Sequence, residues 1–245
     1  MNTSAHPEFQ MSIEGPAIQP IEDELEVIQH YLPLVGARVL ELGCGAAEKT
    51  RQLAEHSQVA EIVAAEVDLQ QHHKNLQIND LSKVTFAAFG AEDIEADDAS
   101  FDIVLMFKSL HHVPIALMHT ALEEIHRVLR PGGLLYVSEP VFAGDFNEII
   151  RLFHDEEAVR TAAFNSLEAA VSTGAFTLAA EHHFKNVIKM QSFSQFETGI
   201  LNVTHTDHSL SPQCLAEVKA RFESHRSDQG YIFEVLNRVD LLEKP

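Results

Sequence analysis

Basic residues are scarce in this chain of 245 residues. Lys and Arg total 17 against 37 Asp and Glu, so the formal net charge is −20. Nucleic-acid affinity depends largely on Lys and Arg contacts to phosphates, and anionic membrane surfaces attract the same cations. The composition therefore argues against nucleic-acid and membrane partners. The surplus of acidic residues is most simply a contribution to solubility.

Cysteines are also few, and long apolar runs are absent. Cys44 and Cys214 lack the spacing of a zinc site or of a disulfide framework, which fits a reducing compartment. No apolar run reaches the roughly 18 residues of a membrane span. The N-terminus shows no basic stretch followed by an apolar core, so we expect no signal peptide. These absences predict a cytoplasmic protein.

A glycine-rich stretch over residues 39–50 organises the rest of the chain. It begins with a short apolar run typical of a strand buried on both faces. Gly43 and Gly45 follow, and glycine can take positive φ and let a ligand approach the backbone closely. A helix comes next, and its free N–H groups would face the same point. The pattern predicts a ligand site at the carboxyl edge of a parallel sheet.

The identity of the ligand depends on two acidic residues. A dinucleotide site would require a third glycine where this chain has Glu48, whose charge would repel a pyrophosphate. Glu41 instead suits a ligand with a positive end. The pattern Glu41-x-Gly43-x-Gly45-x-Ala47 resembles motif I of the class I S-adenosylmethionine-dependent methyltransferases, (Asp/Glu)-x-Gly-x-Gly-x-Gly. Ala47 replaces the last glycine of that motif.

Further pieces of the family follow in the family's order. An apolar strand over 61–68 ends in acids, and another over 84–89 leads into the turn 90–94. Ser-Phe-Asp at 100–102 resembles the entry to the fourth strand, and Leu-Arg-Pro-Gly-Gly at 129–133 precedes the fifth. The resemblance covers residues 20–140 well and 175–245 in outline. It implies an α/β fold: a Rossmann-like seven-stranded sheet, mostly parallel with an antiparallel C-terminal hairpin strand, with helices on both faces and helical lid insertions.

The resemblance implies S-adenosylmethionine as the cofactor and suggests its contacts. Glu66 would accept hydrogen bonds from the ribose hydroxyls, whereas Asp68 would cap the next helix. The turn at 90–94 would pack the adenine, although Gly90 stands where many members carry Asp. The expected cofactor-binding residues are Glu41, Gly43, Cys44, Gly45, Glu66, Val67, Ala91, Glu92, Phe107 and Lys108.

The expected organisation is a flexible arm over 1–19 and a single methyltransferase domain over 20–245. A helical period over 21–32 predicts a helix before motif I. Two segments, at about 141–173 and 191–229, are long enough to form a lid. Strands predicted over 175–190 and 231–242 would complete the sheet.

The chemistry needs alignment more than a fixed set of catalytic residues. The methyl group of a sulfonium is already activated, and a base is needed only where the nucleophile carries a proton. His111 and His112 follow the fourth strand, where a base would lie, although a His-His pair here recurs in the family largely as structure and cofactor contact. Tyr31, His205 and His208 are candidates to contact the acceptor. Three histidines spread over two segments do not indicate a metal site, and we expect none.

Absent motifs narrow the acceptor. The chain has no (Asn/Asp)-Pro-Pro-(Tyr/Phe) after the fourth strand, no cysteine cluster of an arsenite methyltransferase and no Asp…Asp-Asn of the metal-dependent catechol enzymes. We therefore expect a methyltransferase that acts on a small organic acceptor, with oxygen first and sulfur, nitrogen or carbon open. The alternatives are a non-catalytic cofactor-binding regulatory module and a protein methyltransferase. Either a monomer or a homodimer is expected.

Overall fold

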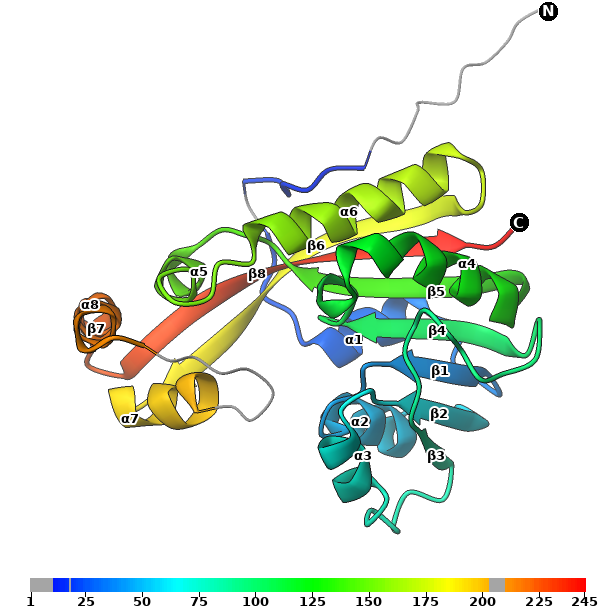
Figure 1. The fold of residues 1–245 in the computed structure, drawn as a ribbon, viewed down its shortest axis with the longest axis horizontal. Coiled ribbons are helices and arrows are strands. Elements are labelled where there is room, and N and C mark those ends of the chain that lie inside the picture. Colours follow the sequence, from blue (N-terminus) through cyan, green and yellow to red (C-terminus); the bar gives the residue numbers. More distant parts are fainter. Residues whose placement is uncertain (1–10, 18, 203–209) are drawn as a thin grey trace, which may run out of the picture.

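The computed structural model describes residues 11–17, 19–202 and 210–245 and shows one twisted sheet with helices on both faces (Figure 1). The strand order is β3-β2-β1-β4-β5-β8-β6. Strand β8 runs in the direction opposite to the six others in this order. The strands are β1 Arg38–Leu42, β2 Glu61–Ala65, β3 Val84–Ala87, β4 Phe101–Phe107, β5 Leu129–Pro140, β6 Thr177–Met190 and β8 Gly230–Glu243, with the short β7 Arg226–Ser227 pairing with β8. The predicted sheet and its antiparallel hairpin strand are confirmed.

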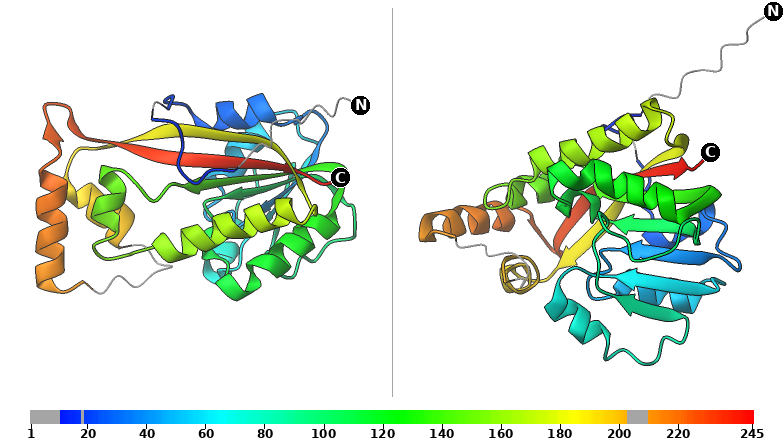
Figure 2. Two further views of the ribbon diagram at one scale, coloured as in Figure 1. Left: turned by 90° about the horizontal axis from the view of Figure 1, so that it is seen from above. Right: turned by 45° about the vertical axis from the view of Figure 1, so that its right-hand side comes forward.

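The two faces of the sheet carry different helices, which Figure 2 shows with the sheet seen from above. The helices are α1 Glu24–Tyr31, α2 Glu48–His56, α3 Leu69–Asn75, α4 Met118–Val128, α5 Asp145–Ile150, α6 Glu157–Ser172, α7 Phe193–Phe196 and α8 Pro212–Glu223. One apolar core joins α4 and α6 to the sheet, and a second joins α1 and α2 to the opposite face. The central strands are buried on both sides, as their continuous apolar sequence predicts.

Helix α6 departs from the expectation of a lid over 141–173. Ala163, Phe164 and Leu167 are buried and belong to the main core beside α4. The apolar residues of α6 therefore cover the sheet, and only the residues before it lie with the other lid segment. The sequence pattern is that of an amphipathic helix, which does not say which surface it covers.

The lid segments have an apolar core of their own. Beyond the pairing of Pro140 with Asn237, β8 leaves β5 and continues to pair with β6, and its first residues also pair with the short β7. This two-stranded extension carries α5, α7 and α8, which lie past the carboxyl ends of β1, β4 and β5 in Figure 1. Their buried side chains form a separate cluster, called here the lid core: Ile149, Met190, Phe193, Phe196, Val218, Phe222, Tyr231 and Phe233. The phenylalanines of this cluster are thus largely interior to the lid.

Two further boundaries differ from expectation. Part of the expected flexible arm is attached to the protein: Met11 is buried in the main core, and the Ser12 N–H donates to the Glu181 carboxylate at 2.8 Å. Strand β5 begins at Leu129, so the Arg-Pro-Gly-Gly stretch belongs to the strand, with an irregularity in its pairing to β4. Long-range pairing decides both boundaries, and local turn propensity does not report it.

No helix in residues 11–17, 19–202 and 210–245 is both long enough and apolar enough to cross a membrane.

Candidate functional site

The glycine turn joins β1 to α2 at the carboxyl edge of the sheet. Gly43, Gly45 and Ala47 all have left-handed φ, at 76°, 53° and 61°. A Cβ on Gly43 would lie 2.7 Å from the Ser109 Cβ, so no other residue fits there without displacement. A Cβ on Gly45 would meet nothing within 4 Å, so the backbone is open on that side. The turn thus exposes backbone where the sequence predicts the cofactor.

Two side chains from neighbouring elements fix this turn. The Glu66 carboxylate after β2 accepts hydrogen bonds from the N–H groups of Gly45 and Asp68, both at 2.8 Å. Asn75 of α3 donates through Nδ2 to the Gly45 carbonyl at 2.8 Å and lies 3.6 Å from the Cys44 sulfur. Glu66 is nearly buried, so its charge is held at the open side of the turn. The structure brings together the predicted Gly45, Cys44 and Glu66, whereas sequence reasoning missed Asn75.

Asp68 and Val67 follow Glu66 and take different roles. The Asp68 carboxylate accepts from the Gln70 N–H and caps α3, as predicted. Val67 is 63% exposed, which is unusual for an apolar residue beside a buried strand. It lies next to the predicted ribose contact and is available to pack on a flat ring.

Glu41 lies within the sheet and does not reach the surface. Its carboxylate accepts a 2.7 Å hydrogen bond from the Thr50 hydroxyl of α2. Burial raises the pKa of Glu41 to about 7, although the Thr50 hydrogen bond and the charge of Lys49 oppose the shift. The side chain therefore ties β1 to the start of α2 and holds a proton near neutral pH.

Glu24 on α1 is a buried acid that sequence reasoning missed. Its carboxylate lies 3.5 Å from the Lys108 ammonium and 3.8 Å from that of Lys49, and it accepts a hydrogen bond from Ser138. Lys108 has φ of 54°, a left-handed conformation that is uncommon for a side chain of this size. Glu24 thus connects α1 to the carboxyl ends of β4 and β5. The predicted apolar face of this helix was wrong in part, because Ile21 is exposed and precedes α1.

The expected adenine turn brings two residues into one place. Ala91 is buried in the main core, so only its backbone is available to a ligand. A Cβ added to Gly90 would lie 2.7 Å from the Glu92 carboxyl carbon. The Glu92 carboxylate therefore occupies the space that a side chain at position 90 would need. A side chain at position 90 and the present position of the Glu92 carboxylate therefore exclude each other.

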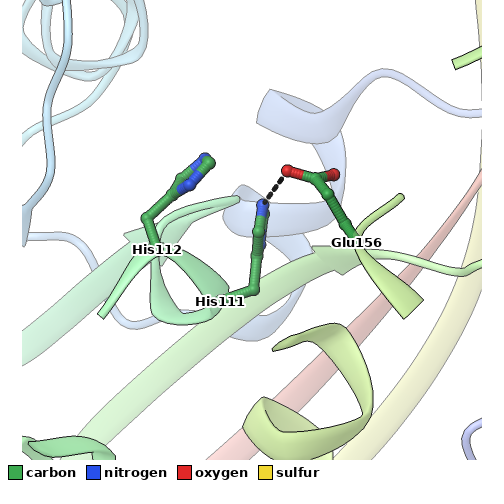
Figure 3. A group of neighbouring side chains, drawn as sticks. All are labelled: His111, His112 and Glu156. Atoms are coloured by element: carbon green, nitrogen blue, oxygen red, sulfur yellow. Dashed lines mark ion pairs between the residues drawn. The ribbon is translucent and has the colours of Figure 1, made fainter. Parts of the chain in front are cut away.

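The histidines after β4 differ sharply in environment. They belong to a 3₁₀ turn, η1 Leu110–His112. His111 is buried, its Nδ1 pairs with Glu139 at the end of β5, and its Nε2 lies 3.7 Å from the Glu156 carboxylate (Figure 3). His112 is exposed, with its ring centroid 4.1 Å from that of His111. His111 is therefore placed to orient its neighbours, and His112 to meet a ligand.

Glu156, from the segment before α6, contacts this turn. It precedes α6, and its second oxygen accepts from Arg160 at 2.6 Å, while His154 lies 2.9 Å from the first. Burial raises the pKa of Glu156, but the charges of Arg160 and His111 outweigh it and hold the pKa below its ordinary value. The side-chain ligand atoms of His111, His112 and Glu156 all lie within 4.8 Å of one another. Sequence reasoning missed Glu156 and Glu139, which are distant in the chain.

The remaining candidates fall elsewhere. Tyr31 packs on His30 and His182 and, with Glu22 and Glu26, lines a depression on the α1 side, so these contacts do not join it to His111. His205 and His208 lie outside the described residues. Phe107 packs on Tyr136 at the end of β4, beside Lys108.

Known proteins similar to this chain in sequence are methyltransferases. Residues 40–137 match the family model of the methyltransferase domain. The chain is similar to 27-O-demethylrifamycin SV methyltransferase of Amycolatopsis mediterranei, with 34% identity over 44% of this chain and 40% of the relative. It is also similar to a probable phthiotriol/phenolphthiotriol dimycocerosates methyltransferase of Mycobacterium ulcerans, with 38% identity over 41% of this chain and 38% of the relative. The chain spans less than half the length of these two relatives.

Solved structures extend the fold match to most of the chain. A Bacillus halodurans protein solved as a putative methyltransferase aligns with a TM-score of 0.62 at 16% identity, covering 91% of this chain and 99% of its own. The [4+2]-cyclase SpnF aligns with a TM-score of 0.57 at 20% identity over 90% of this chain and 78% of its own. These likenesses show the fold alone, and the second shows that the fold also serves other chemistry. Taken together, the motifs, the family model matched over residues 40–137 and the curated relatives support a methyltransferase domain in this chain.

Proposed function

We propose that the protein transfers the methyl group of S-adenosylmethionine to an oxygen of a small organic acceptor. The observation that carries this proposal is the turn in which Glu66 and Asn75 hold Gly45 with its backbone open. A carboxylate at the end of the second strand is suited to a ribose, and an open glycine turn to the methionine part of the cofactor.

The lid segments support a small molecule as the acceptor. The lid core and Glu156 stand beyond the strand ends that carry Lys108 and His112. A lid over the reacting atoms excludes water and aligns a small molecule, whereas a protein substrate would need an open groove. The names of two curated relatives support oxygen as the accepting atom. One is the 27-O-demethylrifamycin SV methyltransferase, and the other is a ubiquinone biosynthesis O-methyltransferase of Neisseria meningitidis.

The reaction needs little from the protein beyond alignment. The acceptor oxygen attacks the methyl carbon in line, the carbon–sulfur bond breaks, and S-adenosylhomocysteine leaves with the electron pair. The hydroxyl proton is lost to a nearby group or to solvent. His112 is the side chain that we assign to the acceptor oxygen, and His111, held by Glu139, is a positioning residue.

Calorimetric titration tests the cofactor half of the proposal. We expect S-adenosylmethionine and S-adenosylhomocysteine to bind and NAD not to bind. Glu66→Ala should weaken cofactor affinity by about 10- to 100-fold, because a carboxylate that accepts hydrogen bonds contributes roughly 1.5–3 kcal/mol. Asp97→Ala, on an exposed residue outside the turn at 90–94, is the control. Unchanged affinity in Glu66→Ala would remove Glu66 from the site.

A second assay tests the acceptor half. The protein with labelled cofactor is incubated with panels of phenols, hydroxy acids, thiols and amines, and transfer is followed by mass spectrometry. Methylation within the oxygen panels supports the proposal. Cofactor binding with no transfer to any panel favours a regulatory module, and transfer only to thiols or amines overturns the choice of oxygen.

A further inference from the structure

The cluster of His111, His112 and Glu156 has a use beyond holding two segments together. Each residue offers one ligand atom, and the three atoms lie within 4.8 Å of one another. Two imidazoles and one carboxylate, with the remaining positions open, are a ligand set common to catalytic zinc and non-haem iron(II) sites. Figure 3 shows the Glu156 carboxylate directed at the His111 ring, with the His112 ring beside it.

The surroundings of the cluster match those of a metal site. Glu139 binds His111 at Nδ1 and thereby leaves Nε2 directed at Glu156. A carboxylate behind a ligating histidine fixes the tautomer and the ring orientation at most protein metal sites. The Glu156 oxygen that does not face His111 is held by Arg160 at 2.6 Å, so the facing oxygen has a fixed direction. Two of the three ligands therefore have partners that orient them, the buried Glu139 and the half-buried Arg160.

The distances between the ligand atoms of the cluster are already close to those around a bound zinc ion. Ligand atoms at about 2.1 Å from a tetrahedral zinc ion lie roughly 3.4 Å apart. The His111 Nε2 and the Glu156 oxygen are already 3.7 Å apart. All three ligand atoms lie within 4.8 Å of one another, so only a small movement of these side chains is needed to close on a metal ion. His154, at 2.9 Å from the same Glu156 oxygen, would yield its place or become a further ligand.

We propose that His111, His112 and Glu156 bind a divalent transition-metal ion, such as zinc, whose open position receives the acceptor oxygen. This inference rests on the proposed function for the role of the metal, though not for its binding. A bound cation stabilises an alkoxide or phenolate, so the acceptor would lose its proton without a protein base. In this form His112 acts on the acceptor through the metal, and Glu139 is a positioning residue.

Metal titration of the purified full chain tests the site without cofactor or acceptor. After treatment with a chelator, the protein is titrated with zinc chloride in a calorimeter and in competition with a chromophoric chelator. We expect one tight equivalent. His112→Gln and Glu156→Gln should weaken that equivalent by at least about 10-fold, and Glu139→Gln by about 10- to 100-fold, although Glu139 is not a ligand.

The matched control is a surface pair of the same chemistry. His119 and Glu123 lie one turn apart on α4, 3.5 Å from each other and exposed. His119→Gln should leave the tight equivalent unchanged. No tight equivalent in the native chain, or native affinity in both Glu156→Gln and Glu139→Gln, would overturn the proposal and assign any weak binding to surface histidines.

Two further measurements separate folding and cofactor binding from metal binding. Each variant is melted thermally and titrated with S-adenosylmethionine. His112 is exposed, so His112→Gln remains a test even if a substitution at a buried position prevents folding. Cofactor binding without metal binding would overturn the metal site alone, whereas metal binding without cofactor binding would leave the site standing and overturn the proposed function. Cobalt(II) in place of zinc should give visible absorption bands that His112→Gln alters.

Discussion

Asn75 on α3 donates a 2.8 Å hydrogen bond to the carbonyl of Gly45, thirty residues earlier in the chain. Asn75 is almost completely buried, so its amide serves the turn and not the solvent. The cofactor turn is therefore held from both sides, by Glu66 at its N–H and by Asn75 at its carbonyl.

Asn75→Ala should lower both stability and cofactor affinity. The substitution leaves the Gly45 carbonyl without its partner, and an unsatisfied buried group costs about 1–3 kcal/mol. We expect the free energy of unfolding to fall by that amount in a denaturant titration, and cofactor affinity to fall several-fold. His73→Ala, on the exposed side of α3, is the control. Equal affinity in Asn75→Ala and native protein would show that the turn does not need this hydrogen bond.

Ala47→Gly should stabilise the protein. Ala47 has φ of 61°, and a left-handed conformation costs a residue with a Cβ roughly 1 kcal/mol more than glycine. We expect an increase in unfolding free energy of about 0.5–1 kcal/mol. Ala54→Gly, inside α2, should act in the opposite direction by a similar amount, because glycine is unfavourable in a helix interior. Destabilisation in both variants would show that the methyl group of Ala47 contributes packing that outweighs the backbone strain.

Glu41 should make stability fall as pH rises toward neutrality. The pKa of Glu41 is raised from 4.5 to about 7, so between these values the folded chain keeps a proton that the unfolded chain has lost. In that window the unfolding free energy decreases with increasing pH, by up to about 3 kcal/mol in total at 1.36 kcal/mol per pH unit. The contribution is fully present below pH 4.5 and lost above about pH 7.

Glu41→Gln is the test of this pH dependence. Its amide oxygen can still accept from Thr50, and it carries no titrating group. Denaturant titrations from pH 4.5 to 8 should show a flatter profile and higher stability than native protein at pH 8. Glu123→Gln on the surface of α4 should keep the native profile. Parallel profiles for native protein and Glu41→Gln would contradict the assignment.

Lys108→Met should destabilise the join between α1 and the strand ends. Glu24 is 2% exposed, and it would lose its nearer cation and keep only Lys49 at 3.8 Å. Leaving a buried carboxylate under-paired costs about 1–3 kcal/mol, and more where no water enters. Thermal melting is the measurement, with the exposed Lys74→Met as the control. Restoration of the melting temperature by Glu24→Gln in the Lys108→Met background would identify the unpaired charge as the cause.

We expect a second substitution at position 92 to restore cofactor affinity to a Gly90→Asp variant. Glu92→Ala should weaken cofactor binding several-fold if its carboxylate serves the adenine. Gly90→Asp alone should be harmful, because its side chain would meet the Glu92 carboxylate. The double substitution Gly90→Asp with Glu92→Ala restores one acid to the turn and should recover most of the affinity in a calorimetric titration. An additive loss in the double variant would contradict the exchange of positions.

Short sequence patterns correctly predicted the strands and helix ends that depend on neighbouring residues in the chain. The apolar run before Gly43 and the Leu-Arg-Pro-Gly-Gly stretch marked strands at the centre of the sheet, and Asp68 was correctly predicted as a helix cap. Glu24, Asn75 and Glu156 could not be found in this way. Each is an ordinary polar residue of a helix or its end, and each acquires its role from a partner at least thirty residues away. Only the burial of a polar side chain marks them, and burial is a property of the folded chain.

The β6–β8 extension separates the lid core from the two apolar cores that cover the faces of the sheet. Phe196 and Phe222 can therefore exchange for other apolar residues without altering the packing around Val104 or Leu135 in the sheet. Under the proposed function, acceptor choice and cofactor capture would then lie on separately evolvable parts of a single chain, and repacking the lid core would change the acceptor without disturbing the glycine turn.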